Sequence, residues 1–254
     1  MAAAPLLAVL GPWIARLPED RFPTCDNLNA LLPTDRSVVS GAGVPLIFTL
    51  PIAATDDAYE ESVFSHGQVP TRAENAHDLF NALAWLAFPH LKARLNARHV
   101  LDLRSNVADR KRSRLRDQLT LFDEGGLIFA TSDPALAALL IARDWPRLFF
   151  ESRTAFGSRC SVTVFGHALF EKGLTPYRGL TGKALVMRVS GSFFADDIDR
   201  QRAQLDLAAS VEFAHGMPVL HPLPVLGVPG WAAENNDRSY YDDTEYFRPK
   251  KAWE

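Results

Sequence analysis

The stretch ENAHDLFNALAWLAFPHLKARLNARH, residues 74–99, decides the fold, because a helical repeat of apolar residues is interrupted by a proline. In a helix, His77, Asn81 and Trp85 would lie on one side at four-residue steps, and apolar residues would cover the other side. Pro89 lacks a backbone donor and restrains the residue before it away from helical geometry. The pattern predicts a helix broken at Pro89. Its polar side could line a site or belong to a core helix with satisfied polar groups.

Length and composition indicate a folded protein with a core of ordinary size. The chain has 254 residues, of which 47% are hydrophobic and 22% are charged. The net charge of −3 argues against wholesale electrostatic binding of nucleic acid or of an anionic membrane, although local basic patches remain compatible with it.

Cysteine usage and the N-terminal segment predict a cytoplasmic protein. Cys25 and Cys160 form neither a CxxC pair nor zinc-finger spacing, so we expect two reduced thiols. Residues 1–22 lack a basic region ahead of their apolar residues, and prolines break the apolar run, which is unlike a signal peptide. Since no apolar run approaches the ~20 residues that span a bilayer, we expect no membrane partner.

The order of the expected elements predicts an α+β fold, with a small antiparallel sheet surrounded by helices. A hairpin is expected from Leu119–Phe122 and Leu127–Ala130, because Asp-Glu-Gly-Gly between them has turn chemistry. A helix is expected over 133–143, capped by Asp133 or Ser132 with Pro134 at its first position, and another over 196–215. Residues 162–172 read as a strand that changes to a helix near Gly166, and 184–189 as a strand.

The absence of linkers and repeats favours one integrated domain over residues 1–254. Within it we expect short wrapping elements over 1–72, a main body over 73–217, and an aromatic tail over 218–254. The tail contains Tyr241, Tyr246, Phe247 and Trp253, so it should pack on the body.

The candidate catalytic residues are His167, Glu171, Asp123 and His77. His167 and Glu171 would lie one turn apart on a helix, where they could bind a metal or act as an acid orienting a base, or simply form a surface hydrogen bond. Asp123 ends an apolar run, a common place for a functional carboxylate, but it also suits a turn. No metal or cofactor can be assigned. P-loop, dinucleotide-binding, HExxH and GxSxG motifs are absent.

A basic run provides the candidate anion-binding residues, with five positive charges in seven residues: Arg110, Lys111, Arg112, Arg114 and Arg116. Such a run could contact the phosphates of RNA or DNA. It could also be a solvated helix face flanked by Asp109 and Asp117, the interpretation that the acidic chain favours.

Several phrases, in order, resemble a family of uncharacterised bacterial proteins defined by domain of unknown function 3025. They are NALAWLAFPHLKARLNARH (81–99), RDQLTLFDEGG (116–126), FGHALFEK (165–172), LGVPGW (226–231) and YYDDTEYFRP (240–249). The resemblance implies a bacterial, cytoplasmic, single-domain protein and supplies no reaction, cofactor or catalytic residue.

Two functional hypotheses remain. The first is an enzyme, with a hydrolase as the leading class, whose polar cleft surrounds His167 and Glu171. The alternative is a non-enzymatic protein that holds RNA or another anionic partner through the basic run.

Overall fold

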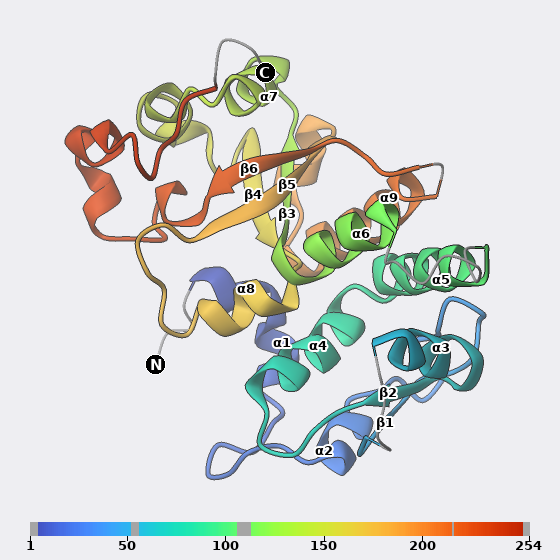
Figure 1. The fold of residues 1–254 in the computed structure, drawn as a ribbon. Helices are drawn as coiled ribbons and strands as arrows, with labels where there is room; N and C mark the ends of the chain where they lie inside the picture. Colours follow the sequence, from blue (N-terminus) through green and yellow to red (C-terminus); the bar gives the residue numbers. More distant parts are fainter. Residues whose placement is uncertain (1–4, 52–55, 106–112, 215, 251–254) are drawn as a thin grey trace.

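The computed structural model describes residues 5–51, 56–105, 113–214 and 216–250, and Figure 1 shows their arrangement. The first part of the chain forms short elements: η1 (Pro5–Leu10), α1 (Gly11–Ile14), α2 (Cys25–Asn29), β1 (Ile47–Thr49), α3 (Asp56–His66) and β2 (Gln68–Pro70). Strands β1 and β2 pair in parallel and form a sheet of their own.

The main sheet has four strands in the order β4–β3–β5–β6. Their bounds are β3 (Gly126–Thr131), β4 (Cys160–Val164), β5 (Thr181–Arg188) and β6 (Leu220–Pro224). β3 pairs antiparallel with β4 and parallel with β5, and β5 pairs antiparallel with β6. The α+β class is therefore confirmed, but the expectation of a purely antiparallel sheet is wrong, since the sheet is mixed. The parallel pair arises because the chain between β3 and β5 forms β4 and several helices before it returns.

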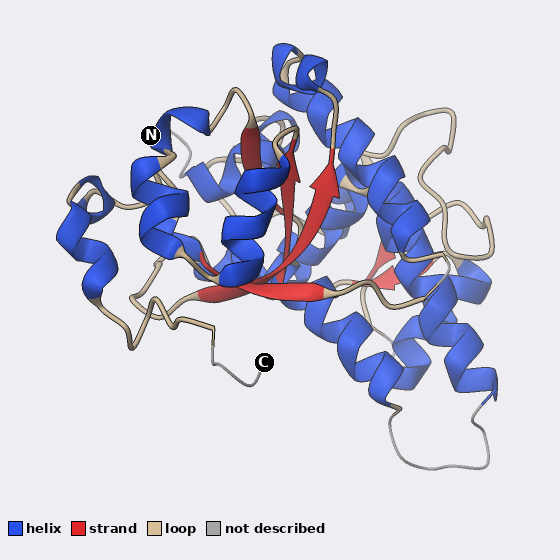
Figure 2. Ribbon diagram, turned by 90° about the horizontal axis from the view of Figure 1, so that it is seen from above, coloured by secondary structure: helices blue, strands red, loops and turns tan. Residues whose placement is uncertain are grey.

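Helices enclose this sheet, as Figure 2 shows from above. Those of the main body are α4 (Ala76–Ala87), α5 (Pro89–Ser105), α6 (Arg114–Gly125), α7 (Pro134–Ala142), α8 (His167–Lys172) and α9 (Ile198–Glu212). α6 contacts β3 and β5, α7 contacts β3 and β6, and η1 contacts β4. α8 packs against both α4 and α6, which brings three separate parts of the chain to one place.

Short helical turns connect and follow these elements: a π-helix, η2 (Pro146–Glu151), and the 3-10 turns η3 (Arg153–Ala155), η4 (Gly191–Ala195), η5 (Val225–Gly227), η6 (Glu234–Asn236) and η7 (Arg238–Asp242). None of the helices within the described ranges combines the length and apolar character needed to cross a membrane.

Side-chain caps fix where the helices begin. Asn75 accepts a hydrogen bond from the Asp78 amide at the start of α4, and Ser113 accepts one from the Arg116 amide at α6. Asp133 caps α7 with Pro134 at the first position, which confirms the predicted start of that helix. α4 ends before Phe88 and α5 begins at Pro89, so the predicted break is also confirmed.

The predicted hairpin between Leu119 and Ala130 is wrong. Residues 114–125 form helix α6, which runs into β3 at Gly126. Leu115, Leu119 and Phe122 recur at helical spacing, and Leu119 and Phe122 are fully buried. The packing of this face outweighs the turn chemistry of Asp-Glu-Gly-Gly, which ends the helix. Asp123 therefore lies in the last turn of a helix.

One hydrophobic core extends along the chain from Leu6 to Phe247. Phe122 packs against Phe165 and Phe213, with ring centroids 5.1 and 4.7 Å apart. In the tail, Tyr241, Tyr246 and Phe247 are buried in this core, whereas Trp253 lies outside the described residues. The Tyr246 hydroxyl donates to the Leu180 carbonyl oxygen and accepts from the Leu226 amide, which ties the tail to the sheet region.

Candidate functional site

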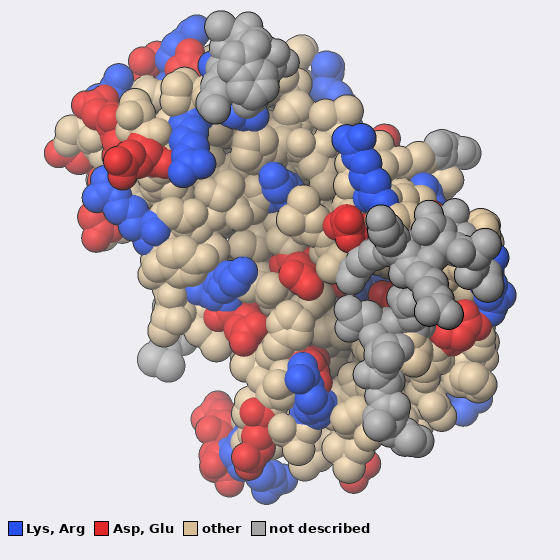
Figure 3. Space-filling model, viewed as in Figure 1, with Lys and Arg blue, Asp and Glu red and all other residues tan. Residues whose placement is uncertain are grey.

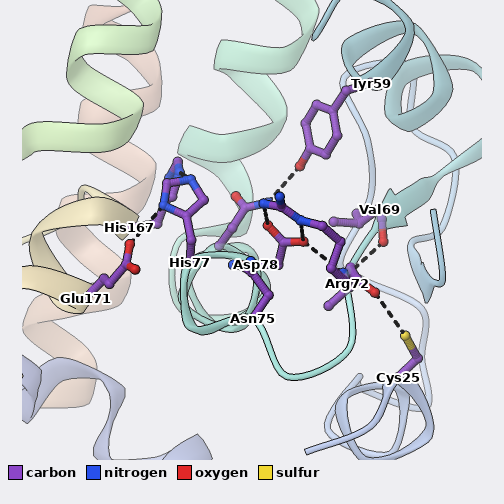
Figure 4. Close-up of polar contacts among 11 residues, drawn as sticks. Cys25, Tyr59, Val69, Arg72, Asn75, His77, Asp78, His167 and Glu171 are labelled. Atoms are coloured by element: carbon purple, nitrogen blue, oxygen red, sulfur yellow. Dashed lines mark hydrogen bonds and ion pairs between the residues drawn. The ribbon is translucent and has the colours of Figure 1, made fainter. Parts of the chain in front are cut away.

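Two histidines meet where α8 packs against α4. His77 lies in the first turn of α4 and His167 begins α8. Their Nε2 atoms are 3.0 Å apart, and their rings meet edge to face at a centroid distance of 4.5 Å. Figure 4 shows the two imidazoles side by side with Glu171 next to His77. The structure thus joins two candidate residues that are 90 positions apart in the sequence.

Each imidazole has a carboxylate beside its other nitrogen. His77 Nδ1 is 3.0 Å from Glu171 Oε2, and His167 Nδ1 is 3.5 Å from Asp123 Oδ2. His167 and Glu171 share a face of α8 at the expected one-turn spacing, and His77 bridges them. All four candidate catalytic residues therefore lie in one continuous group.

The group extends inward through residues that we did not select from the sequence. Lys92 Nζ donates to both oxygens of Asp123, at 2.7 and 2.9 Å, and to Asn81 Oδ1 at 2.8 Å. Asn81 Nδ2 in turn donates to the Tyr59 hydroxyl at 2.7 Å. We call Glu171, His77, His167, Asp123, Lys92, Asn81 and Tyr59 the polar row.

Exposure falls steadily along the row. The side chains of Glu171 and His77 are 40% and 36% exposed, whereas those of Asp123, His167 and Lys92 are 19%, 8% and 5% exposed. The Lys92 ammonium lies 5.3 Å from the centre of the Trp85 ring, so its surroundings are largely apolar. The row has one end that solvent reaches and another that protein encloses.

A glycine allows α8 to begin against the end of α6. A Cβ at Gly166, the N-cap of α8, would lie 2.3 Å from the Glu124 carbonyl oxygen and 2.5 Å from the Gly126 nitrogen. No other residue fits that approach without displacing the backbone. The close contact places His167 beside Asp123, and the expected change from strand to helix near Gly166 is confirmed.

Burial and neighbouring charges decide the protonation states in the inner part. Burial lowers the pKa of His167 to about 4, although the Asp123 carboxylate acts in the opposite direction. Burial raises the pKa of Asp123, but the Lys92 ammonium and its hydrogen bonds outweigh burial and keep that pKa below its usual value. Burial also raises the pKa of Tyr59. At neutral pH the inner end therefore contains a neutral imidazole, a carboxylate and a neutral phenol.

A second polar group adjoins the row on the same helix as Lys92. Asn96 Nδ2 donates to Glu60 Oε2 at 2.8 Å, and burial raises the pKa of Glu60 despite the nearby charge of His99. Lys92, Asn96 and His99 are all buried on α5 at steps of four and three residues. This polar stripe is the sequence signal that could have identified Lys92 as a site residue.

The basic run does not form one solvated face. Arg110, Lys111 and Arg112 lie outside the described residues, and Arg114 is exposed. Arg116 is buried with its Nε 3.5 Å from Asp102 Oδ2, so the expectation that it could contact phosphates is wrong. Figure 3 shows Lys and Arg side chains dispersed among Asp and Glu over the described part of this face.

The described residues contain no group of three or more His, Cys, Asp or Glu side chains arranged to hold a metal ion. Cys25 and Cys160 are free thiols, and burial raises the pKa of Cys160 to about 12, which makes its thiol a poor nucleophile. The chemistry that the site offers is therefore proton transfer along imidazoles and carboxylates.

The fold and the polar row together define an α+β protein with a histidine pair held between carboxylates. The model of the family described as "Protein of unknown function (DUF3025)" matches residues 48–251, and the chain belongs to this family. Neither the curated proteins nor the solved structures gave a match to the chain.

Proposed function

We propose that the protein is an enzyme that performs general acid–base catalysis, and that its reaction is a hydrolysis. The observation that carries this proposal is the polar row, in which a half-exposed carboxylate connects through two imidazoles to a buried ion pair. Two titratable groups with opposite surroundings are the usual basis for separating an acid from a base in one site.

Glu171 is the group that exchanges a proton with substrate. Both nitrogens of His77 are engaged, Nδ1 with Glu171 and Nε2 with His167, so His77 cannot reach a substrate without breaking one contact. Glu171 uses Oε2 for His77, and the other carboxylate oxygen can take a proton from an attacking water. The same proton can then protonate the leaving group.

His77 orients Glu171 and exchanges a proton with it. A carboxylate only accepts hydrogen bonds, so His77 Nδ1 carries the hydrogen when Glu171 is ionised. Transfer of that hydrogen to Glu171 converts the carboxylate into an acid, while His167 supports the other nitrogen of His77. Asp123 and Lys92 act at the buried end and do not contact substrate.

The proposal is tested with chromogenic esters, phosphate monoesters and diesters, glycosides and peptide anilides. Wild-type protein should hydrolyse one class, and Glu171→Gln should lower kcat by about 10²–10⁴, the usual contribution of a general acid–base group. Lys172→Gln is the matched control, because Lys172 is the exposed neighbour of Glu171 on α8 and should keep the wild-type rate. Equal rates for Glu171→Gln and wild type, or no hydrolysis of any class, would contradict the proposal.

The binding hypothesis stays a prediction. Within the described residues no continuous basic surface supports it, because Arg116 is buried and its neighbour Arg114 is exposed. We therefore do not propose it as the function, and its test is given in the Discussion.

A further inference from the structure

We propose that Lys92 is a positioning residue that sets the tautomer of His167 through Asp123, and thereby makes His77 the protonated member of the histidine pair. The inference deepens the proposed function, because it names the group that prepares the acid–base end of the row. The tautomer itself can be observed whether or not a substrate is known.

Lys92 is held in one place by its three donors. Its ammonium has three hydrogens, and its three contacts are Asp123 Oδ1, Asp123 Oδ2 and Asn81 Oδ1. The side chain is 5% exposed. A buried ammonium that contacts both oxygens of a carboxylate keeps that carboxylate ionised, since protonating it would leave the ammonium without its counter-charge.

An ionised Asp123 determines where His167 carries its hydrogen. The carboxylate can only accept, and its Oδ2 is 3.5 Å from His167 Nδ1. That separation is long for a hydrogen bond, so the effect is the electrostatic preference for an N–H over a lone pair beside a negative charge. The backbone carbonyl of Asp123 also interacts with His167 and favours the same tautomer. His167 therefore carries hydrogen on Nδ1 and presents a lone pair at Nε2.

The lone pair on His167 Nε2 requires a donor 3.0 Å away, and only His77 Nε2 is there among the described residues. His77 must also donate from Nδ1 to Glu171, so it carries hydrogen on both nitrogens and a positive charge. Charges then alternate along the row, negative at Glu171, positive at His77, negative at Asp123 and positive at Lys92. The low pKa of His167 is consistent with this assignment, since the proton of the pair belongs to His77.

Other titratable groups face the inner end without a hydrogen bond to Asp123. Glu60 and His99 interact with Asp123 or Lys92 electrostatically, and they lie on α3 and α5. Tyr59 is neutral and reaches Lys92 only through Asn81. Lys92 is the cation that hydrogen-bonds to Asp123, which makes it the residue to change.

The test is two-bond ¹H–¹⁵N correlation spectroscopy of the imidazoles in the full-length protein, with His167 assigned from the spectrum of His167→Gln. In wild type, the protonated nitrogen of His167 should be Nδ1, and both nitrogens of His77 should be protonated. In Lys92→Met, Asp123 should gain a proton, and the hydrogen of His167 should move from Nδ1 to Nε2. Lys172→Met removes an exposed lysine of α8 and should leave the wild-type pattern unchanged.

A second variant keeps the proposal falsifiable if Lys92→Met does not fold. Lys92→Met combined with Asp123→Leu removes both buried charges, a replacement that is often neutral for stability. It should also move the His167 hydrogen to Nε2. Retention of hydrogen on Nδ1 in the folded variants would assign the tautomer to the Asp123 carbonyl and overturn the proposal, as would an Nε2-protonated His167 in wild type. Failure of the proposed function would appear instead as unchanged turnover in Glu171→Gln.

Discussion

The burial of His167 should make the free energy of unfolding depend on pH. In the unfolded chain this imidazole takes up a proton near pH 6.5, but in the folded protein its pKa is about 4. Between these values the unfolded state binds more protons, so the contribution is fully present above about pH 6.5 and is lost as the pH falls towards 4. The shift corresponds to about 3 kcal/mol in total, with about 1.4 kcal/mol lost by pH 5.5 and about 2.5 kcal/mol by pH 4.5.

The assay is urea unfolding followed by tryptophan fluorescence, which should report the core because Trp85 and Trp145 are both 2% exposed. The pH slope of wild type should be compared with that of His167→Gln, which has no imidazole to titrate. His221→Gln is the comparison variant, because half-burial lowers the pKa of His221 less strongly and its loss should remove a smaller part of the slope. Equal slopes in wild type and His167→Gln would refute the reasoning.

Four further outcomes are expected. Gly166→Ala should destabilise the protein by about 1–3 kcal/mol in thermal melts, because its Cβ would press on the Glu124 carbonyl, and an unchanged melting temperature would contradict this. Arg116→Gln should cost about 3–5 kcal/mol by leaving Asp102 buried without this partner, whereas Arg114→Gln should change stability by about 0.5 kcal/mol or less. A 1–217 fragment should aggregate or melt early, since it lacks the buried tail aromatics, and a soluble fragment with wild-type stability would count against a packed tail. If the basic run binds nucleic acid, changing Arg110, Lys111, Arg112 and Arg114 to Gln should reduce the salt slope of binding by about one unit for each phosphate that is no longer neutralised, and wild-type protein without salt-dependent binding would exclude this.

Local signals predict several elements well. Asp133 and Pro134 mark the start of α7, and Pro89 marks the break between α4 and α5, because caps and prolines act over a few residues. The hairpin expected within 114–131 is wrong because its turn residues are compatible with either a hairpin or a helix end. Packing against β3 and β5 decides between them, and this contact is not visible in local sequence.

The candidate site shows the same division between local and distant information. His77, His167, Glu171 and Asp123 can be selected because each residue type can move a proton. Their meeting depends on α8 packing against α4 and α6, which no spacing in the sequence specifies. Sequence reasoning misses Lys92 because a lysine is rarely buried, so a lysine in a helix is normally expected at the surface.

The break at Pro89 also has a consequence for what one continuous helix could have done. Asn81 and Lys92 are 11 residues apart, yet Lys92 Nζ donates to Asn81 Oδ1 at 2.8 Å. Along an uninterrupted helix, that separation corresponds to an axial rise of about 16 Å, beyond the reach of the two side chains. α9 holds the corner in place, since Arg202 donates to the Ala87 carbonyl oxygen before the break and Asp206 accepts from the amides of His90 and Leu91 after it. The proline thus folds one long amphipathic segment back on itself, and a donor and an acceptor separated by three turns of helix become neighbours in a single hydrogen-bonded chain.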